Sequence, residues 1–203
     1  MGLDLLLAAE RVGPGGRIIG VDMTEGMVAR AREAAAVWGA ENIEVRQGIM
    51  EEAPVETGTV DRVISNCAVC LSPEKARAFA EIVRVLRPGG TVTISDIVVG
   101  ELPRWARENK NLYTSCVAGA LGEEEYLEEF RRAGLVDVRV LRKDLFDEPR
   151  LETFLLVGMT GSGRSDPCSC NDYLAGRLLG RTAEKLAGKV GSVTLEGRVP
   201  ARS

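Results

Sequence analysis

The feature that most constrains this chain's fold is an alternation of short apolar runs with amphipathic segments. Runs rich in Val and Ile are followed by segments whose apolar residues recur at helical spacing. Alternation of this kind builds a mainly parallel, doubly wound sheet, because each helix returns the chain to begin the next parallel strand. The expected strands span 17–22, 43–48, 60–66, 91–99 and 136–141, and the expected helices span 27–37, 76–86 and 123–135. The fold class predicted is therefore α/β.

The pattern weakens after residue 142, where two runs compete for the place of the last strand. In chain order this part holds a strand candidate at 151–158, a Gly- and Ser-rich loop at 160–172, a helix expected from Tyr173 to Leu186, and a second strand candidate at 191–197. We therefore divide the chain into a core of residues 1–142 and a small C-terminal segment of residues 143–203.

Composition narrows the class of protein. The 203 residues are 45% hydrophobic and 28% charged, which is enough for one buried core. No run approaches the length of a membrane span and no positive segment precedes the apolar N-terminus, so we expect a cytoplasmic protein without membrane contact. The net charge of −4 predicts no nucleic-acid partner. In the reducing cytoplasm, the five cysteines are expected to be free thiols.

Two of these cysteines, Cys67 and Cys70, stand between an expected strand and an expected helix. Ser72 followed by Pro73 has the form of a helix N-cap and first turn, which places both thiols in the strand-to-helix turn. In open α/β sheets, such turns line the ligand crevice. We expect the dipole of a helix starting at Pro73 to lower the pKa of Cys70. Packing as a small apolar side chain is the alternative for this residue.

Other strand ends carry residues suited to a nucleoside. Asp22 ends the first expected strand, where a carboxylate can accept hydrogen bonds from both ribose hydroxyls, or can instead form a turn or cap the next helix. Ile49 and Met50 follow the second strand, where they can hold an adenine ring or belong to the core. The segment RVLRPGG (84–90) ends a helix and feeds the next strand, an arrangement that recurs in nucleoside-dependent methyltransferases.

Together these motifs resemble a known family, the arsenite methyltransferases that use S-adenosylmethionine. The motifs, in family order, are GVDMT (20–24), VISNC (63–67), LSPEK (71–75), RVLRPGG (84–90), ISDIV (94–98), GELP (100–103) and CVAGAL (116–121). The resemblance covers about residues 3–141, and segment 186–200 is similar to the family's last strand. It is specific because generic class I methyltransferases lack the paired NC and CxxGA motifs. It implies a Rossmann-like class I methyltransferase sheet.

The resemblance also implies residue roles and partners. Cys67 and Cys116 would be the catalytic thiols that bind trivalent arsenic. The residues implied to contact S-adenosylmethionine are Asp22, Met23, Ile49, Met50 and Asn66. Arsenite and methylated trivalent arsenic would be the substrates, in arsenic detoxification, with a thiol reductant such as thioredoxin or glutathione as partner. Trivalent arsenic is soft and prefers thiolates, and its lone pair can attack a methyl group without a general base.

The chain departs from the family at its N-terminal side. Family members begin with a central strand and a glycine-rich loop that faces the cofactor's methionine part, whereas this chain begins at the following helix. We therefore expect an N-terminally truncated sheet, weak cofactor binding, and an enzyme that can be inactive in this form. The family also carries a cysteine upstream of Cys67, so the third arsenic ligand here is either Cys70 or the pair Cys168 and Cys170.

Two other functions fit the same residues. One is methyl transfer to a small organic molecule, with cysteines that are merely structural. The other is a non-catalytic thiol-metal protein, with a zinc site made of Cys67, Cys70, Cys168 and Cys170. The gap between these two pairs is far longer than in compact zinc modules, which disfavours the zinc site.

Overall fold

The computed structural model describes residues 2–108, 112, 116–160 and 180–201. The helices are α1 (Leu3–Val12), α2 (Glu25–Trp38), the short 3-10 helix η1 (Val69–Leu71), α3 (Lys75–Val85), α4 (Arg104–Arg107), α6 (Glu123–Arg132) and α7 (Glu148–Thr160). The strands are β1 (Ile18–Asp22), β2 (Ile43–Gln47), β3 (Val60–Asn66), β4 (Leu86–Val99), β5 (Val136–Leu145) and β6 (Val190–Arg198). The alternation expected through residue 141 is therefore confirmed. Within the described ranges, none of the helices combines the length and apolar composition needed to cross a membrane.

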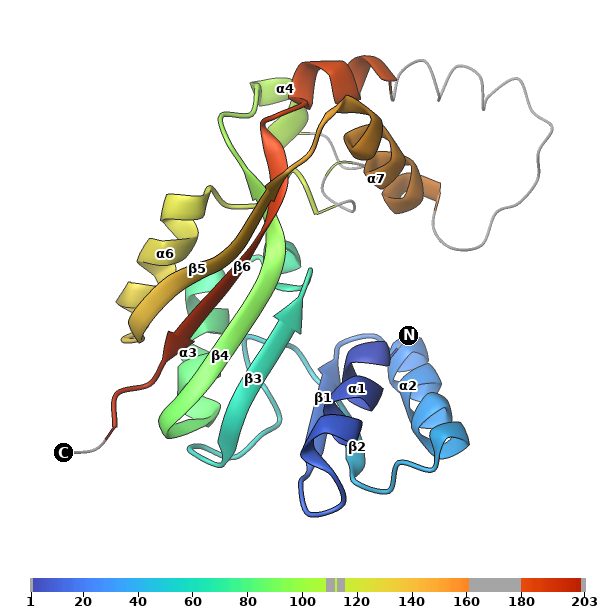
Figure 1. Ribbon diagram of the computed structural model, residues 1–203, viewed down its shortest axis with the longest axis vertical. Helices are drawn as coiled ribbons and strands as arrows, with labels where there is room; N and C mark the ends of the chain where they lie inside the picture. Colours follow the sequence, from blue (N-terminus) through green and yellow to red (C-terminus); the bar gives the residue numbers. More distant parts are fainter. Residues whose placement is uncertain (1, 109–111, 113–115, 161–179, 202–203) are drawn as a thin grey trace.

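The strands of the described residues fall into two sheets rather than one. β1 pairs in parallel with β2, while the second sheet has the order β3-β4-β6-β5. β3 is parallel to β4, and β6 is antiparallel to both β4 and β5, so β3, β4 and β5 point the same way. Figure 1 shows β1 and β3 facing each other across the interruption. The expectation of an α/β sheet is confirmed, and the sheet is interrupted between β1 and β3.

The C-terminal segment differs from expectation in one element. The run 151–158 forms part of helix α7, so its assignment as a strand candidate is wrong. Leu151 and Leu155 lie one helical turn apart and both are fully buried, which fits helical rather than alternating burial. The second candidate, 191–197, is confirmed, because it lies in β6 between β4 and β5. The division at residue 142 stays a prediction.

Part of the C-terminal segment lies outside the described residues. Of the helix expected from Tyr173 to Leu186, residues 180–186 are helical and the remainder lies outside the described residues. Cys168 and Cys170 also lie outside them, as does most of the loop 160–172. The role predicted for this cysteine pair therefore stays a prediction.

The start of α3 also differs from expectation. The helix begins at Lys75, with Glu74 at the N-cap position, and not at Pro73. The Ser72 hydroxyl donates a hydrogen bond to the Glu51 carboxylate on another loop instead of capping the helix. A tertiary contact has replaced the local cap. The 3-10 helix η1 precedes α3 in the chain.

Two apolar clusters hold the larger sheet and its connections. In the first, Phe79 of α3 packs against Tyr126 and Phe130 of α6, with all three rings buried over β4 and β6. The second gathers the end of β4, α7 and the start of β6, and the half-buried Cys116 packs against it. This second cluster brings the segment around Cys116 to the carboxyl end of β4.

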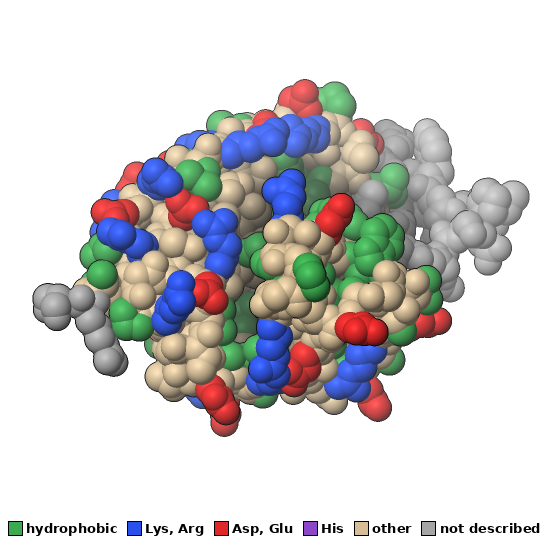
Figure 2. Space-filling view, turned by 60° about the horizontal axis from the view of Figure 1, so that its bottom comes forward, with side chains coloured by type: hydrophobic (Ala, Val, Ile, Leu, Met, Phe, Trp, Pro, Cys, Tyr) green, Lys and Arg blue, Asp and Glu red, His purple; other side chains and the backbone are tan. Residues whose placement is uncertain are grey.

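The interruption leaves apolar side chains exposed. On β3, Ile64 is 56% exposed, and on β1, Val21 is 37% exposed. Figure 2 shows the surface hollowed between the two parts of the molecule, with hydrophobic side chains visible inside the hollow. No described strand pairs with the facing edges of β1 and β3. Open strand edges with apolar side chains are templates for association.

We therefore expect the 203-residue chain to self-associate through these edges in solution. A charge at the edge opposes strand addition, so Ile64→Lys should shift the chain towards monomer. Val37→Lys is the matched control, because Val37 is 83% exposed on α2, away from the interruption. Sedimentation velocity over a range of concentrations measures the effect. A parent chain that stays monomeric throughout would contradict the prediction.

Candidate active site

The thiols lie on a turn at the carboxyl end of β3, which we call the thiol turn (residues 67–72). The Cys67 N–H donates to the Ser95 carbonyl of β4 at 2.9 Å, so the ladder continues one step past β3. The chain then bends with a φ of 50° at Cys67, and Cys116 has a φ of 63°. Residues other than glycine rarely adopt this left-handed backbone region, and those that do cluster at functional sites.

The fold brings the three described cysteines together. The Cys116 thiol donates to the Cys67 carbonyl at 3.8 Å, across 49 positions in the chain. The Cys70 thiol donates a hydrogen bond to the Cys116 sulfur. Cys67 is exposed, Cys116 is half-buried and Cys70 is fully buried. The two cysteines expected to bind arsenic thus adjoin, with Cys70 beneath them.

The three thiols have different pKa values because their surroundings differ. Partial desolvation of the Cys67 sulfur, together with the charge of Asp96, raises the pKa of Cys67 to about 11 although the residue as a whole is exposed. The pKa of Cys70 is raised by its hydrogen bond to Cys116, by burial and by Asp96. The hydrogen bond from Cys70 lowers the pKa of Cys116. The expectation that a helix dipole lowers the pKa of Cys70 is wrong, because α3 begins only at Lys75 and Cys70 lies buried in η1.

These acidities predict an order of alkylation. Iodoacetamide reacts with thiolates, so Cys116 should react first near neutral pH, while Cys67 should react slowly and accelerate as the pH rises towards 11. Cys70 should be protected by its burial. Time courses at several pH values, followed by peptide mass spectrometry, measure the rate at each cysteine. Faster modification of Cys67 than of Cys116 at neutral pH would refute the assignment.

The residues expected at the cofactor lie at strand ends. Asp22 ends β1, and its Oδ1 accepts the Thr24 N–H at 2.8 Å, which forms a local turn before α2, as the turn-forming alternative foresaw. The Gln47 amide donates to the Met23 carbonyl at 3.3 Å, which joins the ends of β1 and β2. Asn66 is exposed at the end of β3. Their cofactor contacts stay predictions.

Ile49 and Met50 do not share one environment. Ile49 is 45% exposed, whereas Met50 is partly buried against the apolar cluster under α3 and α6. The core alternative therefore fits Met50, and Ile49 is left as the exposed apolar residue of the pair. The next residue, Glu51, accepts the Ser72 hydroxyl and so ties this loop to the thiol turn. Sequence reasoning missed this bond, because neither residue belongs to a motif for the other.

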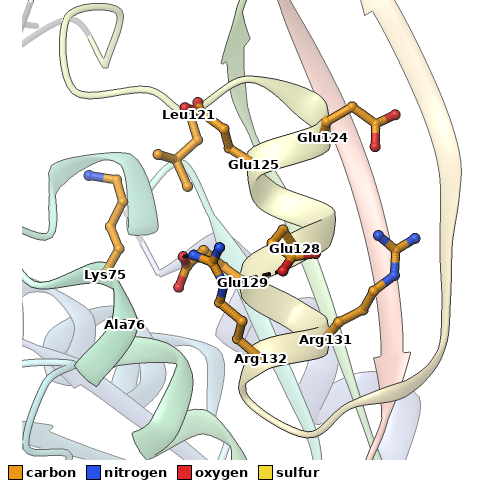
Figure 3. Close-up of a pocket in the computed structure, with 9 residues that line it drawn as sticks. All are labelled: Lys75, Ala76, Leu121, Glu124, Glu125, Glu128, Glu129, Arg131 and Arg132. Atoms are coloured by element: carbon orange, nitrogen blue, oxygen red, sulfur yellow. Dashed lines mark hydrogen bonds and ion pairs between the residues drawn. The ribbon is translucent and has the colours of Figure 1, made fainter.

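A groove between α3 and α6 lies outside the site just described. Figure 3 shows its lining residues, which are Lys75, Ala76, Leu121, Glu124, Glu125, Glu128, Glu129, Arg131 and Arg132. It includes none of the expected thiols or cofactor residues. Arg132 is held there by Glu129 at 3.0 Å and by Glu128 at 3.2 Å. In the part of the chain that the structure describes, no group of three Cys, His, Asp or Glu side chains has the arrangement of a metal site.

Comparisons with known proteins agree with the fold. A family model for a methyltransferase domain matches residues 1–134. The arsenite methyltransferase of Halobacterium salinarum is 45% identical over 144 residues, which are 70% of this chain and 37% of that protein. The nocamycin O-methyltransferase of Saccharothrix syringae is 31% identical over 183 residues, covering 79% of this chain and 65% of that protein. The chain thus spans less than two thirds of the length of either relative.

A solved structure extends the similarity. The arsenic(III) S-adenosylmethionine methyltransferase CrArsM of Chlamydomonas reinhardtii superimposes with a TM-score of 0.68 at 29% identity. The match covers 97% of this chain and 59% of that protein. The similarity therefore extends through the C-terminal segment, beyond the residues that the family model matches.

Proposed function

The chain belongs to the S-adenosylmethionine-dependent methyltransferase family, and from that premise we propose that it methylates trivalent arsenic held by Cys67 and Cys116. The observation that carries the proposal is the approach of these two residues, with the Cys116 thiol bonded to the Cys67 carbonyl at 3.8 Å. The Halobacterium salinarum relative, which is similar in sequence, and CrArsM, which is similar in fold, both have arsenic substrates in their names. The activity of a longer protein containing this chain is part of the same proposal.

The thiols act first. Each thiol that displaces a hydroxyl of arsenite forms one S–As bond, and its proton leaves with the hydroxyl as water. Cys116, with its lowered pKa, supplies the first sulfur, and the exposed Cys67 closes the chelate. Cys70 stays the candidate for a third sulfur, although its complete burial favours a supporting role.

The bound cofactor supplies an electrophilic methyl group on a sulfonium. The residues that would hold it are Asp22 and Met23 at the end of β1, Ile49 after β2 and Asn66 at the end of β3. Carboxylate, amide and exposed apolar side chains suit ribose hydroxyls and an adenine ring.

Arsenic is then the nucleophile. The cofactor would supply the methyl group, and the lone pair of arsenic held by Cys67 and Cys116 would accept it, with the electron pair of the methyl–sulfur bond left on the cofactor's sulfur. No proton has to be removed from arsenic, which suits a chain without histidine. Arsenic is formally oxidised by two electrons, and a dithiol or two glutathione thiols return it to the trivalent state. The thiols work only while reduced, which is the condition of the cytoplasm.

The test is transfer of isotope-labelled methyl groups with arsenite as acceptor. We expect labelled methylarsenic, detected by mass spectrometry, and loss of the product when Cys67 or Cys116 is replaced by Ser. Arsenite binding to the reduced chain, measured separately, tests the thiol site even if turnover is slow. A chain that neither binds nor methylates arsenite would refute the proposal.

Transfer to an organic hydroxyl is the second candidate. The similarity to the nocamycin O-methyltransferase favours it, because that match covers more of both chains than the Halobacterium match does. Parallel assays with small phenols and carboxylic acids distinguish the two. Methylation of such acceptors that is unaffected by Cys67→Ser and Cys116→Ser would select this candidate.

A further inference from the structure

We propose that Asp96 and Tyr126 form a positioning pair, which holds the thiol turn in the conformation that lets two sulfurs chelate one arsenic. Neither residue is exposed, so neither would touch the substrate. The inference rests on the proposed function and adds to it the group that fixes the geometry of the thiols.

Asp96 is a buried carboxylate at the centre of a small network. It lies on β4 and is 1% exposed. Its Oδ2 accepts both the Cys70 N–H at 2.8 Å and the Tyr126 hydroxyl at 2.6 Å, while its Oδ1 accepts the Ile97 N–H at 2.9 Å. A buried carboxylate is tolerated when hydrogen-bond donors surround it, so these bonds hold their donors firmly in place.

Tyr126 reaches the Asp96 carboxylate from helix α6, which packs over β4. It lies on α6, fully buried, and its ring meets the Phe79 ring edge-on with centroids 6.1 Å apart. Burial and the charge of Asp96 raise the pKa of Tyr126, so its hydroxyl stays a donor. A phenylalanine would fill the same apolar space. The hydroxyl is therefore explained by its bond to Asp96 rather than by packing.

The thiol turn is held from its other side as well. The Lys75 ammonium donates to the Cys70 carbonyl at 3.3 Å and to the Ser72 carbonyl at 2.9 Å. The backbone of Cys70 is thus held at its N–H by Asp96 and at its carbonyl by Lys75. Holding both backbone groups of Cys70 leaves the turn little freedom to relax around this residue.

Both expected arsenic ligands depend on this turn. Cys67 begins it, with a left-handed φ of 50° that only surrounding contacts can maintain. The Cys116 thiol bonds to the Cys67 carbonyl, so movement of the turn also changes its position relative to the second sulfur. Because chelation needs both sulfurs at one spacing, a shift of the order of 1 Å weakens it strongly.

The test removes one hydroxyl. Tyr126→Phe keeps the ring and loses the bond to Asp96, and we expect arsenite affinity of the reduced chain to fall about tenfold, as for a lost hydrogen bond to a charged group. Thr93→Val is the matched control. It removes a buried hydroxyl from the same strand as Asp96, and that hydroxyl has no hydrogen-bond partner among the described residues. The control should bind arsenite like the parent.

A second probe separates positioning from a general loss of structure. Methylmercury binds one thiol, so its affinity does not depend on the spacing of two sulfurs. Tyr126→Phe should bind methylmercury like the parent while binding arsenite more weakly. Equal weakening for both probes, or arsenite affinity equal to that of the parent, would overturn the proposal.

Asp96→Asn repeats the test with a side chain of the same size, in case Tyr126→Phe does not fold. It should weaken arsenite and spare methylmercury, and the double variant should resemble either single variant because the two residues share one bond. Additive losses would overturn the pairing. If the parent chain does not bind arsenite at all, the proposed function fails first, which distinguishes that outcome from failure of the positioning pair.

Discussion

An apolar strand fused ahead of Gly2 should join the two sheets and raise the free energy of unfolding by several kcal/mol. β1 and β3 each present an edge that no described strand pairs, and both belong to parallel pairs. A strand inserted between them would bury both faces, and each fully buried apolar side chain contributes about 1.5 to 3 kcal/mol.

Helix α1 is already placed to make this connection. A Cβ added to Gly20 on β1 would lie 2.8 Å from Leu5 of α1, so the helix packs closely on the strand. A strand followed by a helix and a parallel strand is the common right-handed crossover unit. The added strand therefore needs only a short loop before α1 to reach the slot between β1 and β3.

Denaturant unfolding of the fused and parent chains measures the difference. The control is a segment of equal length and composition in which alternate residues are proline, because proline cannot complete a strand ladder. Equal stabilisation by both segments would show that the gain comes from added apolar mass and not from strand pairing.

Cofactor affinity should follow the same change. The 203-residue chain should bind S-adenosylmethionine no more tightly than about the millimolar range, since β1 and β3, whose ends carry expected cofactor residues, lie in separate sheets. Calorimetric titration of parent and fused chains provides the comparison. Tight binding by the parent chain would mean that the two separate sheets already form a complete cofactor site.

The sequence predicted the elements whose pattern is local. The alternation through residue 141 predicted the strands and helices, because hydrophobic periodicity and glycine stops act within each segment. It also predicted that the carboxyl ends of the parallel strands lie near one another. The run 151–158 misled because its continuous apolar character fits a buried strand and a buried helix alike. Only the structure shows that Leu151 and Leu155 are both buried one helical turn apart, which identifies the segment as a helix.

The site residues that belong to sequence motifs could be predicted. Cys67 and Cys116 were found by resemblance, and the fold places them together. The acidity of Cys70 was predicted wrongly, since it depends on Asp96 and Cys116, which are distant in sequence. The bond between Tyr126 and Asp96 spans 30 positions and leaves no local signal. Tertiary contacts that set acidity and position are the part that periodicity cannot supply.

Replacing either Cys67 or Cys116 by Ser should lower arsenite affinity by about a hundredfold or more. A hydroxyl is a hard, protonated ligand, and the single thiol that remains loses the advantage of chelation. Each single variant should therefore resemble the double variant closely, because a single S–As bond lacks the chelate effect that supplies most of the affinity. Arsenite titration of the reduced protein, followed by loss of titratable thiols, gives the affinities.

Two further variants make this result specific. Cys70→Ser should be milder, because Cys70 is fully buried and its thiol supports Cys116 through a hydrogen bond. A loss as large as that of Cys116→Ser would instead identify Cys70 as the third sulfur. Cys168→Ser is the comparison variant, and we expect it to matter least because its loop carries no sequence feature that ties it to the strand ends. If this variant lost binding while Cys67→Ser and Cys116→Ser bound like the parent, arsenic would be held elsewhere and the thiol-metal alternative would gain support.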